Sequence, residues 1–208
     1  MRIPRGPLTD LIVGANVAVF VIGWLAGQAG NMALLGGFIA ARLSGEALGV
    51  AAVPAILTPL SSAFLHGDVF HLLFNMLLLL LSGRFVEMAL GWRLYGLLYL
   101  AAAYGAALVQ WAIDPAATAI VIGASGAMSG VLAAYMLLFA RGPERPWGPL
   151  PAAWARMGAL LLMWVLINLA LGLGGMLGRQ VAIGAHIGGF MVGLLLARPL
   201  LRFRYRNA

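Results

Sequence analysis

Long apolar runs with few charges between them constrain this chain more than any other feature. Of its 208 residues 63% are hydrophobic and 9% are charged, whereas a soluble globular domain carries roughly a quarter charged residues. Such a chain cannot cover itself with a solvated surface, so a lipid bilayer is its natural solvent. Runs such as Leu72–Leu81 do not alternate polar with apolar residues, as barrel strands do, and this favours membrane-spanning helices.

A span needs about 20 apolar residues, and by this measure we expect an all-α polytopic membrane protein with a bundle of six spanning helices. They are predicted near residues 9–28, 69–88, 93–111, 125–141, 154–172 and 181–199. With the N-terminus inside, eleven arginines fall in inner segments and two, Arg42 and Arg179, in outer ones. Cytoplasmic segments retain an excess of arginine, so both termini are expected to be cytoplasmic.

The chain is expected to form one membrane domain over residues 1–208, with an outer connection at about 29–68 and no appended soluble domain. Within that connection, Arg42 and Glu46 stand four residues apart, which predicts a short amphipathic helix between Phe38 and Leu48 lying in the interface. The compact chain, without a transit-like start, suggests a multi-pass protein of a prokaryotic inner (plasma) membrane. Its net charge of +7 comes from scattered arginines, so we expect lipid rather than nucleic acid as its surroundings.

Polar residues gather at one predicted depth. His71 and Asn75 lie in the first turns of the second helix, Ser125 opens the fourth, and His186 lies early in the sixth. All three helices start on the outer side. Because polar groups within a span are costly and tend to mark function, these four residues are predicted to form one site that faces the non-cytoplasmic side.

The segment Gly123-Ala124-Ser125-Gly126 predicts an exposed nucleophile at a helix start. Glycine before the serine permits an unusual backbone approach to the helix, and glycine after it removes side-chain bulk. The unpartnered N–H of Ser125 can donate to a developing oxyanion. A serine hydroxyl needs a base within hydrogen-bond reach, and His186 is the candidate. Small residues at four-residue spacing on both helices favour the necessary close approach: Gly126 and Gly130 on the fourth, Ala185, Gly189 and Gly193 on the sixth.

The remaining site residues follow from the same geometry. His71 and Asn75 are one turn apart on one helix face and can complete the oxyanion hole, with Gly123 beside them. No carboxylate stands at this depth on the fourth or sixth helix, so a Ser-His dyad without an acidic orienter is predicted. The outer-loop carboxylates Asp68 and Asp114 are expected to be solvated. The chain has no cysteine, which excludes thiol catalysis.

From about residue 57 onward the chain resembles the rhomboid family of intramembrane serine proteases. The matching motifs, in order, are His71-x-x-x-Asn75, Gly123-x-Ser125-Gly126 and Ala185-His186-x-x-Gly189-x-x-x-Gly193. The resemblance implies a six-helix bundle with a water-filled cavity open to the outside, Ser125 as nucleophile and His186 as general base. It implies that His71, Asn75 and the Ser125 amide hold the oxyanion, and that His66 anchors a loop.

Three places depart from the family pattern, one of them Ile122, which stands where a second glycine often precedes the serine motif. Leu57-Thr58 stands where Trp-Arg is common in the first loop, and Ser129 replaces a tyrosine that commonly stacks on the catalytic histidine. The change at Ser129 leaves the orientation of His186 without its usual support.

The predicted activity is a serine endopeptidase that hydrolyses peptide bonds of transmembrane protein substrates near the outer face, with no cofactor and no metal. Three alternatives remain open: a catalytically weak or inactive rhomboid-like protein that binds transmembrane helices, a small transporter that relays protons through its histidines, and a zinc site built from His66, His71 and His186. The natural substrate and the oligomeric state do not follow from the sequence.

Overall fold

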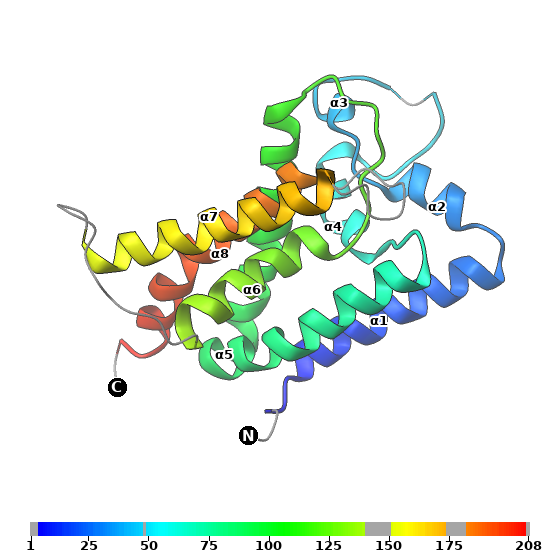
Figure 1. The fold of residues 1–208 in the computed structure, drawn as a ribbon. Coiled ribbons are helices and arrows are strands. Elements are labelled where there is room, and N and C mark those ends of the chain that lie inside the picture. The colour runs from blue at the N-terminus through cyan, green and yellow to red at the C-terminus, as the bar shows by residue number, and fades with distance from the viewer. Residues whose placement is uncertain (1–3, 48, 140–150, 174–181, 207–208) are drawn as a thin grey trace.

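Helices form the framework of the computed structural model, which describes residues 4–47, 49–139, 151–173 and 182–206. Over these residues four helices are long and apolar enough to cross a membrane: α1 (Pro7–Leu25), α5 (Val69–Ile113), α7 (Ala152–Leu173) and α8 (Ile183–Arg204). A shorter apolar helix, α6 (Ser125–Phe139), lies among them (Figure 1). The described part of the chain is therefore all-helical, as predicted, apart from an isolated antiparallel bridge between Phe38 and Val121.

The predicted second and third helices form one element, α5, with a turn at Gly91. The backbone of Gly91 has φ 76° and ψ 157°, outside the helical region, and a positive φ is tolerated best by glycine. The two arms of α5 run in different directions from this point (Figure 1). The Arg204 guanidinium donates to the Met88 carbonyl oxygen at 2.9 Å, so the end of α8 lies beside the turn.

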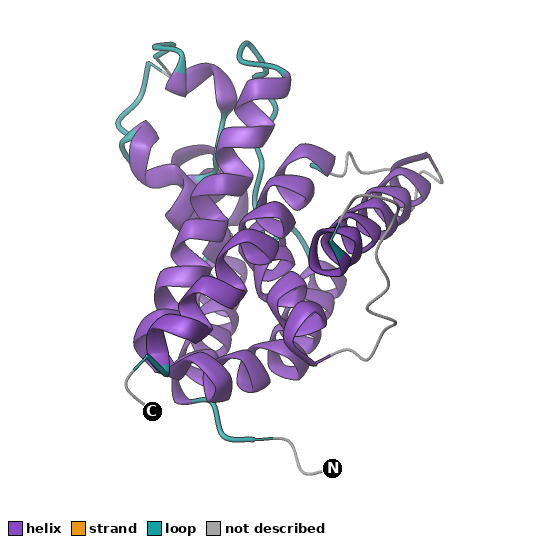
Figure 2. Ribbon diagram, turned by 90° about the vertical axis from the view of Figure 1, so that its left-hand side faces the viewer, coloured by secondary structure: helices purple, strands orange, loops and turns teal. Residues whose placement is uncertain are grey.

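The start of α1 is fixed by a carboxylate from α5. Glu87, 4% exposed, accepts hydrogen bonds from the backbone N–H groups of Leu8 and Thr9 at 2.9 and 2.8 Å and from the Thr9 hydroxyl at 2.8 Å. The first N–H groups of a helix lack intrahelical partners and carry the positive end of its dipole, which explains a buried carboxylate here. As a result, α1 begins at the end of the bundle where α8 finishes (Figures 1 and 2).

Glycines bring α5, α6 and α8 into backbone contact. A Cβ atom added at Gly189 would collide with the carbonyl oxygen of Gly126, and a Cβ atom added at Gly193 would collide with the carbonyl oxygen of Gly130. On the other side of α8, a side chain at Gly188 would meet the Gly105 carbonyl of α5. The small-residue stripes therefore pack as the sequence predicted, because without a hydrophobic driving force membrane helices associate through close contact.

The connection between α1 and α5 contains short helices: α2 (Ala29–Gly36), α3 (Ala40–Leu43), a single turn at Ala55–Leu57 called η1, α4 (Thr58–Ser61) and a turn at Ser62–Phe64 called η2. The amphipathic helix expected between Phe38 and Leu48 is shorter than predicted and covers only α3. Ala40 and Ala41 are buried, and Arg42 donates to the Val53 carbonyl oxygen at 2.8 Å. Folding of the loop onto itself, rather than an i, i+4 charge pair, determines this conformation.

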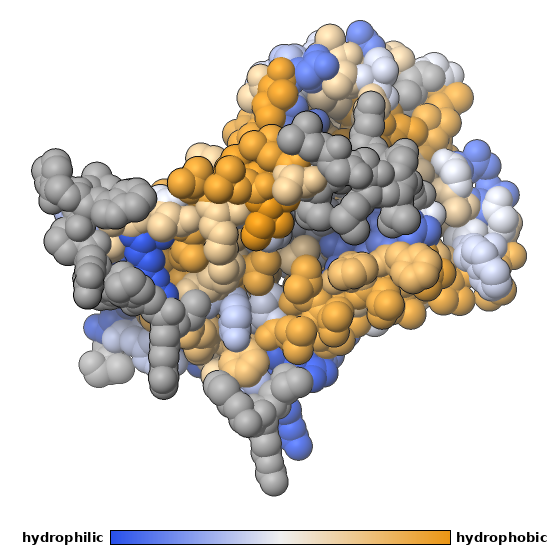
Figure 3. Space-filling model, viewed as in Figure 1, coloured by the Kyte–Doolittle hydropathy of each residue, from blue (hydrophilic) through white to orange (hydrophobic). Residues whose placement is uncertain are grey.

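Large apolar side chains are exposed on the outside of the bundle. Leu11, Trp24, Phe70, Phe74 and Leu166 are each more than half exposed. In Figure 3, hydrophobic residues gather over α7 and over the arm of α5 that lies beside α1. A lipid environment accounts for such a surface, since soluble monomers rarely expose large continuous apolar areas.

Candidate active site

Ser125 is the first residue of α6, and the chain before it is held by hydrogen bonds from the connecting loop. Gly123 has φ 121°, a conformation that favours glycine, and its N–H donates to the Ser62 carbonyl oxygen at 2.9 Å. The next N–H, that of Ala124, points at His66 Nε2 at 3.4 Å. His66 thus lies where the resemblance to rhomboid proteases places a loop-anchoring histidine.

His186 reaches Ser125 from the first turn of α8. Its Nε2 atom lies 2.8 Å from the Ser125 hydroxyl oxygen, a distance typical of a hydrogen bond between a nucleophile and its base. The two residues are 61 positions apart in sequence. They meet because Gly126 lies against Ala185 where the two helices start, so the geometric part of the sequence prediction agrees with the structure.

His71 and Asn75 also lie at this end of the bundle. A side-chain carbon at Gly123 would lie 2.6 Å from His71 Nε2 and 3.6 Å from the Ser125 hydroxyl oxygen, so the His71 ring covers the backbone just before the serine. Asn75 is buried, and its Nδ2 donates to the His71 carbonyl oxygen at 2.9 Å. The amide therefore uses one of its two hydrogens within its own helix, which the sequence reasoning did not foresee.

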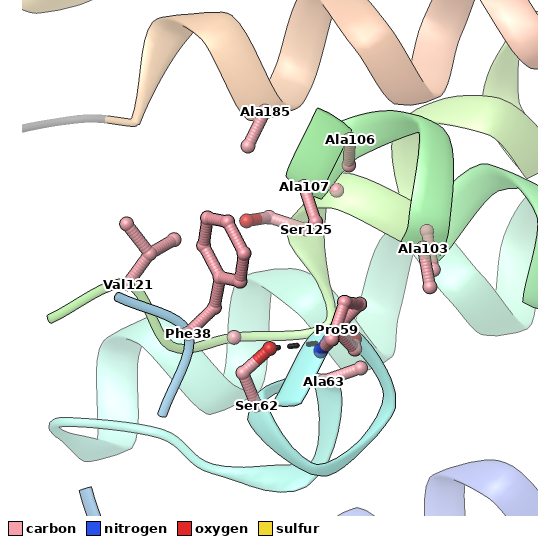
Figure 4. A pocket seen from close by; sticks show the side chains of 13 residues that line it. Phe38, Pro59, Ser62, Ala63, Ala103, Ala106, Ala107, Val121, Ser125 and Ala185 are labelled. Carbon is pink, nitrogen blue, oxygen red and sulfur yellow. Dashed lines mark hydrogen bonds between the residues drawn. The ribbon is translucent and has the colours of Figure 1, made fainter. Parts of the chain in front are cut away.

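A pocket with mostly small side chains opens beside Ser125. The hydroxyl of Ser125 and the ring of Phe38 project into it, and Ala106, Ala107 and Ala185 lie close by (Figure 4). Phe38 is held in place by its bridge to Val121, with N···O distances of 2.9 and 2.8 Å. The complete lining also includes Pro59, Ser62, Ala63, Ala103, Val121, Gly123, Gly126 and Ala127.

A fifth polar residue, which was not predicted from the sequence, contacts His186. Asn168 of α7 is 1% exposed, and its Oδ1 lies 2.6 Å from His186 Nδ1. The sequence prediction covered only carboxylates on the predicted fourth and sixth helices. It did not include an amide on the predicted fifth helix, which is α7. A signal was present, because Asn168 is the one strongly polar side chain between Trp164 and Leu173, and intramembrane polar groups tend to mark function.

Other predicted residues have structural partners. Ser129, where the family commonly has tyrosine, donates its hydroxyl to the Ser125 carbonyl oxygen at 2.6 Å. Asp68 is not simply solvated as expected: it caps α5 by accepting from the His71 N–H at 2.8 Å. Asp114 accepts from the Ala116 N–H at 3.2 Å. In the described residues, no three histidine, cysteine or acidic side chains converge as metal ligands.

His66 lies in the loop before α5 and is buried, with 6% of its surface exposed. Burial, and the neighbouring His71 ring at 4.9 Å between centroids, lower the pKa of His66 to about 3. The folded protein therefore holds a neutral imidazole there, which can accept the Ala124 N–H.

This pKa predicts a stability that depends on pH. An unfolded histidine titrates near 6.5, so below that pH the unfolded chain binds a proton that the folded chain does not. The contribution of His66 to the free energy of unfolding should be constant above about pH 7.5 and fall by about 2 kcal/mol between about pH 6.5 and 4.5. Unfolding in detergent at several pH values should show a weaker acid destabilisation for His66→Gln than for the wild type. If the free energy of unfolding of both proteins fell equally with decreasing pH, His66 would not be the buried neutral imidazole described here.

Comparison with known proteins identifies the family of this chain. The family model of the Rhomboid domain matches residues 54–203. "Rhomboid protease GlpG" of Pectobacterium atrosepticum is 31% identical over 92% of this chain and 62% of its own length. "RHOMBOID-like protein 5" of Arabidopsis thaliana is 31% identical over 68% of this chain and 43% of its own length. "Rhomboid-type serine protease 2" of Emericella nidulans is 29% identical over 67% of this chain and 26% of its own length.

The chain spans between about a quarter and three fifths of the length of these curated relatives. The matched region contains Ser125, His186, His71 and Asn75 together. Because the family model matches well over half of its length, this chain belongs to the rhomboid family.

Proposed function

We propose that this protein is a serine endopeptidase of the rhomboid type, with Ser125 as nucleophile and His186 as general base. The observation that supports this most strongly is the 2.8 Å contact between His186 Nε2 and the Ser125 hydroxyl oxygen. Relatives named as proteases point the same way. The substrates proposed are transmembrane segments of other proteins in the bilayer.

The proposed reaction proceeds through an acyl-enzyme. The Ser125 oxygen attacks the scissile carbonyl carbon while its proton passes to His186 Nε2. The carbon–nitrogen bond breaks as His186 returns that proton to the leaving amine. Water then attacks the ester, again giving a proton to His186, and the Ser125 hydroxyl is restored when the new carboxyl terminus leaves.

The negative charge on the carbonyl oxygen is proposed to lie between the Ser125 N–H and the side chains of His71 and Asn75. The N–H of the first residue of α6 lacks an intrahelical partner and lies at the positive end of the helix. His71 Nε2 lies beside Gly123, and Asn75 retains a second amide hydrogen. Donors fixed before the reaction stabilise a developing charge without reorganisation.

The small side chains around Ser125 favour small residues near the cleaved bond. Ala106, Ala107 and Ala185 line the pocket into which the hydroxyl projects. A helical substrate presents no free carbonyl, since each is bonded within its own helix, so glycine or proline nearby should promote cleavage by unwinding it.

We propose six spans, counting the two arms of α5 separately and including α6, with both termini cytoplasmic and the site facing outward. The bias of eleven arginines to two supports this orientation. We also propose that these spans form a single membrane domain.

The second candidate is an inactive rhomboid-like protein that binds transmembrane helices, because several relatives carry the name "RHOMBOID-like" without a stated activity. A fluorophosphonate probe distinguishes the two, since it reacts with an activated serine. We expect labelling of Ser125 in the wild type and none in His186→Ala. A wild type that stays unlabelled would favour the second candidate.

Direct proof of the activity is a cleavage assay. Purified protein in liposomes is incubated with a panel of single-span substrates whose sequences differ in glycine and proline content, and the products are identified by mass spectrometry. We expect one bond to be cut near the outer face, and faster in substrates with helix-breaking residues. Products that are equally abundant with Ser125→Ala protein would show that Ser125 is not the nucleophile and would refute the proposed function.

A further inference from the structure

Asn168 is a buried amide on the face of α7 that meets α8. It is 1% exposed, whereas its neighbours Leu166, Ile167 and Leu169 are between 41% and 57% exposed. An amide inside a membrane helix costs free energy unless it is hydrogen-bonded. Its two hydrogen bonds therefore show what it is placed to do.

The first bond fixes the orientation of the amide. Asn168 Nδ2 donates to the Trp164 carbonyl oxygen at 2.9 Å, one turn earlier in α7. The nitrogen faces a group that can only accept, so the oxygen is the atom turned toward α8. An asparagine amide is thus held in one of its two possible orientations.

The second bond fixes the proton on His186. Asn168 Oδ1 lies 2.6 Å from His186 Nδ1, and an amide oxygen can only accept a hydrogen bond. In the neutral ring the Nδ1 atom must therefore carry the hydrogen. The other nitrogen, Nε2, is then free of hydrogen and can accept the Ser125 proton across 2.8 Å.

We propose that Asn168 is a positioning residue that holds His186 in the tautomer and orientation required to deprotonate Ser125, making a Ser-His-Asn series across α6, α8 and α7. This inference rests on the proposed protease function. Asn168 touches no reacting atom of the substrate, and acts through the imidazole.

Contacts from α7 support His186 in the absence of a stacking tyrosine. Ser129 stands where a stacking tyrosine is common and bonds instead to the Ser125 carbonyl oxygen. From α7, Trp164 donates its ring N–H to the His186 carbonyl oxygen at 3.2 Å, and its ring stacks on that of Phe190 with 5.1 Å between centroids. α7 therefore holds both the backbone and the ring of His186.

A neutral amide suits this position better than a carboxylate for a physical reason. A buried carboxylate far from water carries a large desolvation penalty. The amide oxygen still offers a partial negative charge to the imidazolium that forms when His186 takes the Ser125 proton. The imidazolium then has a partner for its Nδ1–H throughout the reaction.

Nitrogen-15 NMR of histidine tests the tautomer without any substrate. The chain has three histidines, so selective labelling gives three imidazoles, and the His186 signals are those lost in His186→Ala. At mildly alkaline pH we expect the wild-type His186 to show a protonated Nδ1 and an unprotonated Nε2. In Asn168→Leu the two tautomers should mix, which a purely structural role of Asn168 would not produce.

Kinetics provide the second measurement. Asn168→Leu should lower kcat about tenfold, the equivalent of one neutral hydrogen bond, with KM unchanged. Asn168→Asp also offers an oxygen to Nδ1, so it should recover part of this loss, the remainder being the desolvation cost of a buried carboxyl group. The matched control is Asn16→Leu: Asn16 is equally buried and donates to the Ile12 carbonyl oxygen at 2.8 Å. That variant should keep the wild-type tautomer and kcat.

Two results would overturn the inference. One is an Asn168→Leu protein with wild-type kcat and a single Nδ1–H tautomer. The other is equal loss of kcat in the Leu and Asp variants, since then the acceptor oxygen is not what matters. Failure of the proposed function would give different results: Ser125→Ala would remain active, or the wild type would cleave nothing. The NMR measurement of the His186 tautomer needs no substrate, so it tests the role of Asn168 independently of those results.

Discussion

Replacing Ser125 with alanine is expected to lower the rate of peptide-bond cleavage by about 10⁴-fold or more. The hydroxyl oxygen of Ser125 is the attacking atom in the proposed reaction, and alanine removes it without disturbing the first turn of α6. Replacing His186 with alanine should cost about as much, because the hydroxyl then has no base at 2.8 Å. The measurement is the initial rate on a single-span reporter in liposomes, normalised to folded protein.

The double variant tests most directly whether Ser125 and His186 act as one unit. Residues that act as one unit are strongly non-additive, so Ser125→Ala combined with His186→Ala should be no slower than either single variant, within a few fold. All three proteins should insert and unfold like the wild type. Costs that multiply in the double variant would show that the two side chains act independently, and the dyad would have to be abandoned.

Replacing Gly189 with alanine is expected to separate α6 from α8 and to abolish activity. The added carbon would collide with the Gly126 carbonyl oxygen, which is backbone and cannot rotate away. Overpacking of this kind destabilises by about 1–3 kcal/mol. Because Gly126 directly follows Ser125, the displacement also opens the contact between Ser125 and His186. The free energy of unfolding in detergent and the cleavage rate should therefore fall together.

Gly14→Ala is the matched control. Gly14 lies within α1, and no atom stands within 4 Å of a carbon added there. Alanine is the better helix former by about 1 kcal/mol, so this variant should be as stable as the wild type or slightly more stable. Equal behaviour of the Gly189 and Gly14 variants would show that α6 and α8 are not in backbone contact at Gly189.

The sequence predicted the placement of the candidate site residues better than it predicted the connections between helices. The start of α6 at Ser125 followed from two glycines around a serine, and the approach of α8 followed from Gly189 and Gly193. The helix expected between Phe38 and Leu48 was wrong in extent, because its conformation depends on the bond from Arg42 to Val53 and on the bridge from Phe38 to Val121. Both are contacts between segments, which no local pattern contains.

The amino-acid sequence by itself determined the membrane helices, the serine at a helix start and the histidine that could reach it, because apolar length, glycine and the cost of polar groups in lipid act locally. Only the tertiary structure decided that an amide, Asn168, faces His186 and that Glu87 caps α1. Each of these depends on how one helix is rotated against another. Rotation is set by the packing of all the helices together, so a single segment cannot reveal it.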